Sequence, residues 1–311
     1  MPALSRAGPT LLVVALLVGS AAAFAVTERL KLDPTPITGT RVDKILSPIC
    51  ACPTDAAEIS FRLLKPGTIT VDLIDSASHS VRTLVSRRHE PAGRATFRWN
   101  GRDESGRVVG DGVYRPRVRL QAHGRTIVLP NPIRVDTVRP VIALTAVRPT
   151  VFSPDGDGRR DKIRVFYQVS ERARARLLVD GKQRVLGRRS GLKGKLEWYG
   201  RTDGVALPAG TYAIAVAAVD QAGNRSRPSQ AVPVRLRFIE LARRSIQVQA
   251  GKRFGVRVDT DARTFAWRFA GGTGTGRRGQ LVLRAPRAPG TFTLYVVEGG
   301  HADRAVVQVR P

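Results

Sequence analysis

The sequence predicts an all-β protein made of tandem β-sandwiches, preceded by one apolar helix at the amino terminus. Three observations lead to this prediction. Short apolar–polar alternations recur roughly every 8–12 residues and are separated by Gly, Pro, Asp and Asn, as in β-sandwiches. No long amphipathic helix stands out after residue 40. A unit of roughly 100 residues, the size of one sandwich domain, occurs twice.

Length and composition limit the classes of protein. The 311 residues suit two or three domains, and 42% apolar with 25% charged residues is a globular composition. Two cysteines cannot build a disulfide-dense scaffold, and four scattered histidines leave little material for metal catalysis or a Ser/His/Asp triad. Enzyme classes are therefore disfavoured from the start, and no catalytic residues are expected.

The net charge of +27 should attract anions such as nucleic acid, acidic glycopolymers or anionic lipid head groups. The charge is spread along the whole chain, and 44 of the 52 basic residues are Arg. No helix-borne basic stripe and no nucleic-acid-binding motif stands out. Specific nucleic-acid binding is therefore not expected.

Residues 1–27 are expected to be a signal peptide or a transmembrane anchor. Arg6 is the only charged residue before Glu28, and the apolar run ends in the small-residue segment Ala23-Phe24-Ala25, which favours a secretory signal. The charge-free span from Ala7 to Thr27 is also just long enough for an uncleaved membrane anchor. A buried helix of a soluble protein is a third alternative. Residues 28–40, which contain Pro34 and Pro36, are expected to form a stiff linker.

Two alternating segments predict strands with one core face and one solvent face. The expected core residues are Ile69, Val71 and Leu73 in the first segment, and Ala173, Ala175, Leu177 and Val179 in the second. The expected solvent-facing residues are Thr68, Thr70 and Asp72, and then Arg172, Arg174 and Arg176. The arginine row is interpreted as a solvated sheet face, with contact to a polyanion as the alternative.

The repeat centres on a segment that runs from tryptophan to tyrosine. In the first copy Trp99 is followed by an Asn-Gly-Arg-Asp turn and by Gly112-Val-Tyr114, and in the second Trp198 leads to Gly210-Thr-Tyr212. Each tryptophan should end a strand and fill the space between two sheets. Gly101 and Gly200 allow backbone conformations that a side chain would oppose, and Asp103 and Asp203 can accept backbone N–H bonds in a turn.

These segments resemble a known family. FRWNGRDESGRVVGDGVYRPRVRL and LEWYGRTDGVALPAGTYAIAVAAVDQAGNRS are similar to the Ig-like domain of FlgD, the flagellar hook-capping protein, which also occurs in many exported bacterial proteins. The resemblance implies tandem immunoglobulin-like sandwiches of seven strands at 41–137 and 138–237. The hook-binding amino-terminal region of FlgD has no counterpart here, so a hook-cap role is not implied.

Residues 238–311 are expected to form a third, smaller β-sandwich. Apolar patches separated by turn residues continue to the end of the chain, and Pro289-Gly-Thr-Phe-Thr-Leu-Tyr295 echoes the Gly-x-Tyr strand starts. The glycine-rich run Gly271–Gly276 lacks the Gly-Lys-Ser/Thr that completes a phosphate-binding loop and has no βαβ context. We therefore expect it to form a hairpin.

The second copy opens with a candidate calcium site. Asp155, Asp157 and Asp161 lie in the glycine-rich segment Phe152-Ser-Pro-Asp-Gly-Asp-Gly-Arg-Arg-Asp161, where three carboxylates can converge on one hard cation. The segment resembles the Phe-Ser-Pro-Asn/Asp-Gly-Asp-Gly openings of exported bacterial Ig-like domains, and no Glu follows at the position that an EF-hand requires. The alternative is a plain turn held by Asp side chains.

The first copy aligns with this opening from Ser47 to Asp55 but lacks Asp155 and Asp157, and it has cysteines in place of two glycines. We expect that this copy lost the cation and holds its loop by a Cys50–Cys52 disulfide, which an oxidising compartment permits. Two free thiols are the alternative, and a zinc site is disfavoured because no nearby ligand completes a tetrahedron.

The sequence thus predicts a non-enzymatic, exported protein of the cell envelope, either membrane-anchored or secreted, that acts as a surface scaffold or adhesion module. Its expected partners are a protein or an anionic cell-wall polymer at the cell surface, and the membrane if residues 1–27 are not cleaved. The alternative is a calcium-dependent binding module for acidic cell-wall polysaccharide. Calcium is the one cofactor that the sequence suggests.

Overall fold

The computed structural model describes residues 7–32 and 35–311, so Arg6 and Pro34 lie outside the described residues. One helix, α1 (Ala7–Leu32), covers most of the predicted export segment and continues into the predicted linker. Within the described part of the chain, no helix has both the length and the apolarity that a membrane span requires. The linker is also shorter than predicted, because the first strand begins at Ile37.

The prediction of an all-β fold is confirmed, since 59% of the chain lies in strands. The chain divides into two compact units, which are described separately: unit 1 consists of residues 1–48 and 54–136, and unit 2 of residues 49–53 and 137–311. The hydrophobic side chains gather in three clusters, one in unit 1 and two in unit 2. The domain boundaries at 137 and 237 stay predictions.

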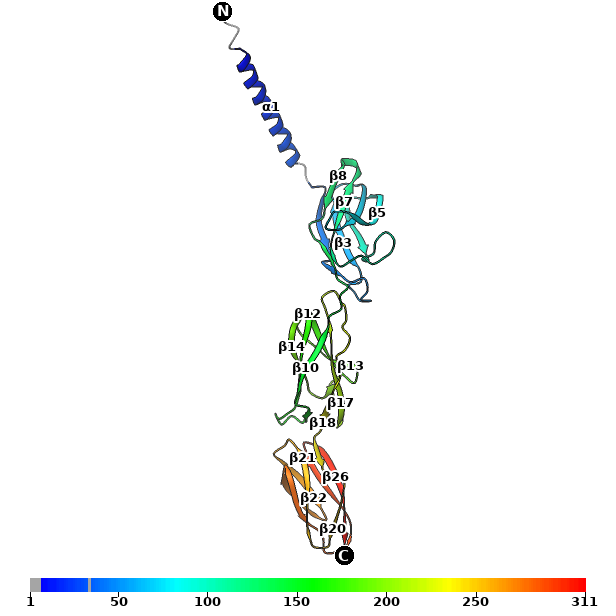
Figure 1. Cartoon of the computed structure of the whole chain (residues 1–311), viewed down its shortest axis with the longest axis vertical. Coiled ribbons are helices and arrows are strands. Elements are labelled where there is room, and N and C mark those ends of the chain that lie inside the picture. Colours follow the sequence, from blue (N-terminus) through cyan, green and yellow to red (C-terminus); the bar gives the residue numbers. More distant parts are fainter. Residues whose placement is uncertain (1–6, 33–34) are drawn as a thin grey trace, which may run out of the picture. The chain divides into compact units, whose positions relative to one another are not determined.

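Unit 1 holds a sandwich of two sheets, and several of its strands are marked in Figure 1. The smaller sheet has the order β1 (Ile37–Val42), β3 (Ala57–Leu63), β6 (Gly93–Trp99). The larger has the order β2 (Ile45–Leu46), β9 (Ile133–Val135), β7 (Gly112–Leu120), β4 (Gly67–Ile74), β5 (Ser80–Glu90), and β8 (Arg125–Val128) also pairs with β7. Only the β2–β9 pair is parallel among these strands.

The first sandwich of unit 2 repeats this strand order with one change. The long strand β12 (Ile163–Val179) serves both sheets: its first half pairs with β10 (Ile142–Arg148) and β14 (Gly191–Trp198), and its second half with β13 (Lys182–Leu186) and β17 (Gly210–Val219). The second sheet continues through β18 (Val232–Leu236) to the parallel strand β11 (Val151–Phe152). A small hairpin of β15 (Arg201–Thr202) and β16 (Val205–Ala206) follows β14. The sequence repeat is therefore a repeat of topology.

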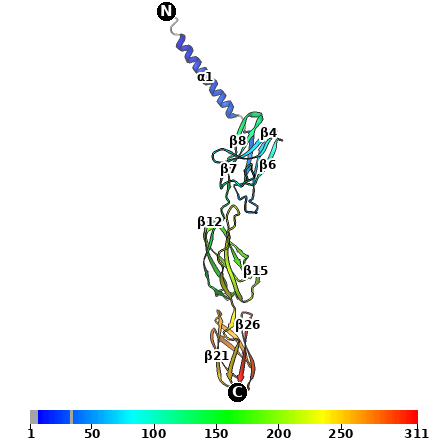
Figure 2. The same cartoon turned by 45° about the vertical axis from the view of Figure 1, so that its right-hand side comes forward.

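The second sandwich of unit 2 lies in the region of the predicted third β-unit and has the same sheet orders. One sheet runs β19 (Ile239–Leu241), β21 (Arg253–Thr260), β24 (Gly279–Arg284), and the other runs β20 (Ser245–Gln249), β26 (His301–Arg310), β25 (Gly290–Glu298), β22 (Thr264–Phe269), β23 (Gly272–Arg277). Figure 2 marks β21 and β26, one from each sheet.

The glycine-rich run forms a hairpin strand, as expected. β23 pairs with β22 along its length. A side chain at Gly274 would come within 2.7 Å of the Trp267 ring, and one at Gly276 within 2.7 Å of the Phe265 ring. The glycines therefore leave room for two aromatic rings from the neighbouring strand, which is a packing role.

The repeated Trp–Tyr segment closes the first two sandwiches. Trp99 and Trp198 end β6 and β14, are only 1% and 2% exposed, and lie edge-on against Tyr114 and Tyr212. Their indole N–H groups donate to the carbonyl oxygens three residues later, and each tyrosine hydroxyl donates to the carbonyl four residues earlier. These tyrosine bonds match the tyrosine corner of Ig-like sandwiches. The predicted core role of both tryptophans is confirmed.

The two turns that follow the tryptophans differ. The Asp103 carboxylate accepts the backbone N–H of Arg107 at 2.9 Å, as expected for a turn residue. Asp203 instead has a left-handed backbone (φ 50°) and, with Gly204 (φ 82°), forms the two-residue turn between β15 and β16. Asp and Gly are favoured in such hairpin turns because they tolerate positive φ.

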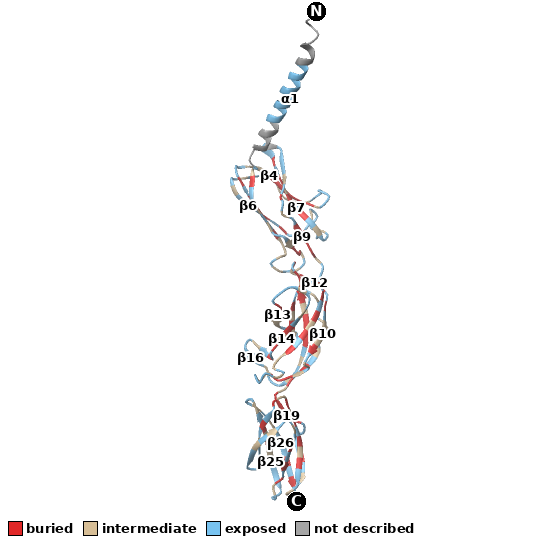
Figure 3. Ribbon diagram, turned by 90° about the vertical axis from the view of Figure 1, so that its left-hand side faces the viewer, coloured by how far each residue is buried: buried red, intermediate tan, exposed pale blue. Residues whose placement is uncertain are grey.

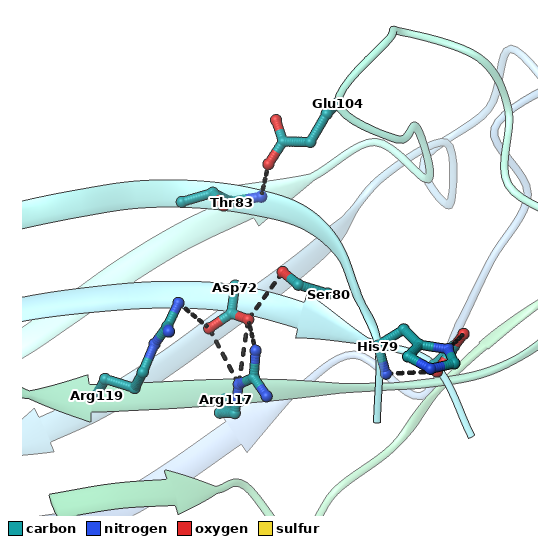
Figure 4. Close-up of polar contacts among 8 residues, drawn as sticks. Asp72, His79, Ser80, Thr83, Glu104, Arg117 and Arg119 are labelled. Atoms are coloured by element: carbon teal, nitrogen blue, oxygen red, sulfur yellow. Dashed lines mark hydrogen bonds and ion pairs between the residues drawn. The ribbon is translucent and has the colours of Figure 1, made fainter. Parts of the chain in front are cut away.

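The predicted core residues are buried, and Figure 3 shows the alternation of buried and exposed residues along strands such as β26. Arg172 and Arg174 are exposed as predicted, whereas Arg176 is half-buried. The prediction that Thr70 and Asp72 face solvent is wrong, because both are buried. The Arg117 and Arg119 side chains on the neighbouring strand β7 cover this face of β4 and pair with the Asp72 carboxylate, as Figure 4 shows.

Candidate functional site

The loop between β11 and β12 brings the three predicted aspartates together. Its backbone turns through left-handed conformations at Gly156 (φ 88°) and Gly158 (φ 81°). The two carboxylate oxygens of Asp161 accept the N–H groups of these glycines at 2.8 and 2.9 Å. Asp161 therefore holds the loop in a tight ring around its own side chain.

Asp155 and Asp157 face into the same ring. Asp155 accepts the Ser153 hydroxyl at 2.9 Å and the N–H of Asp157 at 3.1 Å, and Asp157 accepts the N–H of Arg159 at 2.7 Å. One oxygen from each of the three carboxylates lies within 4.8 Å of the other two. Oxygen ligands of one Ca²⁺ ion, at 2.3–2.6 Å from it, lie within about 5 Å of one another.

The donor set therefore fits calcium. The same hydrogen bonds are those of an Asp-held turn, so the loop has the features of both alternatives that the sequence left open. The assignment of Asp155, Asp157 and Asp161 as metal ligands stays a prediction.

Two further carboxylates approach this loop, and no sequence pattern pointed to either. Asp261 lies between β21 and β22, and Glu298 is the last residue of β25. The Arg159 guanidinium donates to the backbone carbonyl of Asp261 at 3.2 Å. A side chain added at Gly299 would lie 3.4 Å from the Asp155 Cβ.

Burial and negative neighbours alter the acidity of these two side chains. Burial, and then the charges of Asp155 and Asp157, raise the pKa of Asp261 to about 6. Burial, and then the charges of Asp155, Asp261 and Asp157, raise the pKa of Glu298 to about 7. Both Asp261 carboxylate oxygens and one of Glu298 are buried without a hydrogen-bond partner. Sequence periodicity carries no signal for a contact across more than 100 residues.

An open groove of about 570 Å³ adjoins the loop. Its lining residues include Asp155, Asp161, Arg184, Tyr199 and Arg201. Lys162 donates to Glu197 at 2.7 Å and to the Tyr199 hydroxyl at 3.0 Å. The hydrogen bond from Lys162 lowers the pKa of Glu197, so this pair is charged at neutral pH.

The corresponding loop of the first copy carries a disulfide between Cys50 and Cys52, whose Cα atoms are 5.2 Å apart. Ala51 between them has a left-handed backbone (φ 47°), which supplies the bend that so short a link requires.

The two openings correspond in their packing. Ser47 and Ser153 are both buried, at 0% and 1% exposure. A side chain at Gly101 would lie 2.8 Å from Leu46 and 3.0 Å from Pro48, just as one at Gly200 would lie 3.2 Å from Phe152 and 2.9 Å from Pro154. This contact requires glycine in both copies and supports the gapless alignment of the two openings.

No protein-family model matches this chain, and no curated protein matches it. Solved structures with a similar arrangement include the fibronectin(III)-like modules of Clostridium thermocellum CbhA, which are 18% identical with a TM-score of 0.37 over 64% of this chain and 94% of that one. The I9–I11 tandem of titin is 10% identical with a TM-score of 0.32 over 87% and 99%. A carboxy-terminal fragment of intimin in complex with the Tir intimin-binding domain is 12% identical with a TM-score of 0.31 over 68% and 69%. The Ig-like fold of this chain follows from its own strand order.

Proposed function

We propose that this chain is a non-enzymatic, exported protein of the bacterial cell envelope whose tandem Ig-like sandwiches act as a surface scaffold or adhesion module. The observation that carries the proposal is the use of the repeated Trp–Tyr segment. The rings pack against each other and the polar atoms bond the backbone within the sandwiches, at Trp99 and Tyr114 in the first copy and at Trp198 and Tyr212 in the second. The most distinctive residues of the sequence therefore have a structural role, as the resemblance of the two copies to FlgD-type Ig-like domains implies.

Two features support export. The charge-free segment from Ala7 to Thr27 suits a signal peptide or an anchor. The Cys50–Cys52 disulfide fits an oxidising compartment, because thiols stay reduced in the cytosol of most cells. The net charge of +27 suits contact with anionic polymers of a cell wall.

Fractionation of expressing cells, with amino-terminal sequencing of the purified chain, tests this proposal. We expect residues 28–311 outside the cytoplasm, either with a new amino terminus after Ala25 or with the original one in the membrane fraction. Recovery of the intact chain from the cytosol would contradict the proposal.

A second candidate function is calcium-dependent binding of an acidic cell-wall polysaccharide. The groove beside the carboxylate loop favours it, because Arg184 and Arg201 offer cationic contacts and Tyr199, 47% exposed, offers a ring on which a sugar can stack.

Retention on isolated cell wall distinguishes the two candidates. Binding that needs calcium and falls with salt, and that is lost in Tyr199→Ala but kept in Val205→Ala, supports the polysaccharide module. Val205 is a fitting control because it is exposed in the same domain but does not line the groove. Retention that is indifferent to calcium and salt supports a scaffold.

A further inference from the structure

The carboxylate loop of the first sandwich of unit 2 lies against two loops of the second. Glu298 and Gly299 belong to the β25–β26 hairpin, and Asp261 belongs to the β21–β22 connection. Contact is direct, since the Arg159 guanidinium donates to the Asp261 carbonyl at 3.2 Å and a side chain at Gly299 would lie 3.4 Å from the Asp155 Cβ.

The Asp261 carboxylate is buried at this contact without any bond. Asp261 as a residue is half-buried, but both of its carboxylate oxygens are inaccessible and accept no hydrogen bond within the described part of the chain. Burying a carboxylate without a hydrogen-bond donor or a cation costs several kcal/mol in general, so such groups are rare unless they bind a proton or a metal. Glu298 adds a second buried oxygen of the same kind.

The concentration of negative charge at this contact also favours binding of a cation. Asp155, Asp157 and Asp161 offer oxygens within 4.8 Å of one another, and the charges of Asp155 and Asp157 act on Asp261 and Glu298, in a chain whose net charge is strongly positive. Two basic side chains of the loop are directed to other acceptors: the Arg159 guanidinium donates to the Asp261 backbone carbonyl, and Lys162 donates to Glu197.

Calcium suits the number and kind of these groups. Ca²⁺ takes six to eight oxygen ligands in a flexible geometry, whereas Mg²⁺ requires a near-ideal octahedron. The loop alone offers three carboxylates, which leaves the coordination incomplete. Two more carboxylates from the facing loops bring the set to the usual range once backbone carbonyls or water are added.

We propose that one Ca²⁺ ion binds between the two sandwiches of unit 2, with Asp261 and Glu298 completing the ligand set of the Asp155–Asp161 loop, so that the ion fixes one sandwich to the other. This inference rests on the calcium site of the loop described above. It adds two ligands to that site and places the ion between two domains.

Calorimetric titration of the full-length chain with CaCl₂ after EDTA treatment tests the inference. We expect one site per chain. Extracellular modules bind calcium with dissociation constants of about 10⁻⁴–10⁻³ M, and a site with five carboxylates should lie at the tight end of this range, on the order of 10⁻⁴ M or tighter. Asp155→Asn, Asp261→Asn and Glu298→Gln should each weaken binding at least about tenfold, because affinity follows the number of charged ligands. Asp203→Asn, an exposed turn carboxylate of the same sandwich, should bind as the unmodified chain does.

The outcomes separate the loop site from the shared site. If Asp155→Asn abolishes binding while Asp261→Asn and Glu298→Gln bind normally, the loop binds calcium alone and the inference is overturned. If the unmodified chain binds no calcium, both the loop site and the inference fail, while the scaffold function is still decided by fractionation.

Hydrogen exchange on the unmodified chain gives a readout that needs no variant. Saturating Ca²⁺ should slow the amides of residues 155–161, 261–263 and 298–300 together, at least about tenfold, because one ion constrains all three loops. Slowing confined to residues 155–161 would overturn the shared site.

Discussion

The ion pair between Asp72 on β4 and Arg117 on β7 offers a quantitative test of how the first sandwich is stabilised. The Asp72 carboxylate is 0% exposed and accepts the Ser80 hydroxyl at 2.9 Å and the Arg117 Nε at 3.1 Å, with a second, closer bond from the other end of the same guanidinium (Figure 4). Arg119 lies farther away, at 3.6 Å. The Arg117 side chain is 20% exposed and that of Arg119 49%. The two arginines therefore face the same charge from different environments.

Arg117→Met should lower the free energy of unfolding by about 3 kcal/mol. Removing one partner of a buried pair costs about 3–5 kcal/mol because the other charge stays buried, and Arg119 compensates part of the loss. Arg119→Met should cost no more than about 1 kcal/mol, the usual range for exposed pairs. The double variant Asp72→Asn with Arg117→Met should be more stable than Arg117→Met alone, because it leaves no buried charge uncompensated.

Native-state hydrogen exchange of the β4 and β7 amides measures these differences in the intact chain. A change of 3 kcal/mol corresponds to about 10²-fold faster exchange of the slowest amides, at 1.4 kcal/mol per factor of ten. Equal effects of Arg117→Met and Arg119→Met would refute the assignment of the buried partner. A double variant no more stable than Arg117→Met would refute the argument from uncompensated charge.

Further predictions concern the second sandwich, the short disulfide and the carboxylates. Gly200→Ala should destabilise the second sandwich by roughly 2–4 kcal/mol, from a φ of 64° and an overpacked contact, as faster exchange of the β14 and β17 amides would show. Replacing both Cys50 and Cys52 by Ser should cost at most about 1.6 kcal/mol in the exchange-derived free energy of unfolding, because a three-residue ring restricts the unfolded chain little. Non-reducing mass spectrometry of the purified chain should find no thiol open to alkylation. The folded pKa values of Asp261 and Glu298, about 6 and about 7, lie above their ordinary values. Folding therefore takes up protons, and the stability they contribute is lost as the pH rises from about 4 through about 7. Without calcium, the thermal unfolding midpoint of this junction should be lower at pH 8 than at pH 5, and a midpoint that rises over that range would contradict the assignment.

Local sequence patterns were sufficient to predict the sandwiches. The tryptophan at a strand end, the glycine after it and the tyrosine at the next strand start act within about 15 residues, so their roles are legible without knowledge of the rest of the chain. The Ser-Pro opening before each loop is equally local, and the aligned glycines contact it in both copies. Here local propensity and global packing agree, which is the condition for a fold to be read from sequence.

The errors arose where a side chain depends on what covers it. Alternation placed Asp72 on the outer face of β4 correctly, but it could not show that two arginines from β7 would cover that face. The two-residue periodicity of side chains along a strand assigns a residue to one face of the sheet, but it does not show whether that face is buried. Asp261 and Glu298 illustrate the same limit at longer range, since Asp261 lies 102 residues from its loop partner Arg159 and Glu298 lies farther along the chain.

The two aligned loops show how one backbone position can be held in two ways. In the first copy a covalent bond between Cys50 and Cys52 links neighbouring residues and is independent of solution conditions, short of reduction. In the second copy Asp161 closes the ring by hydrogen bonds, and the remaining carboxylates repel one another unless a proton or cation joins them. A disulfide needs nothing from a neighbouring domain, whereas carboxylates can share an ion with one. Cysteines at the positions of Gly156 and Gly158 therefore hold the aligned loop of the first copy by a covalent bond, where the second copy uses hydrogen bonds to a carboxylate.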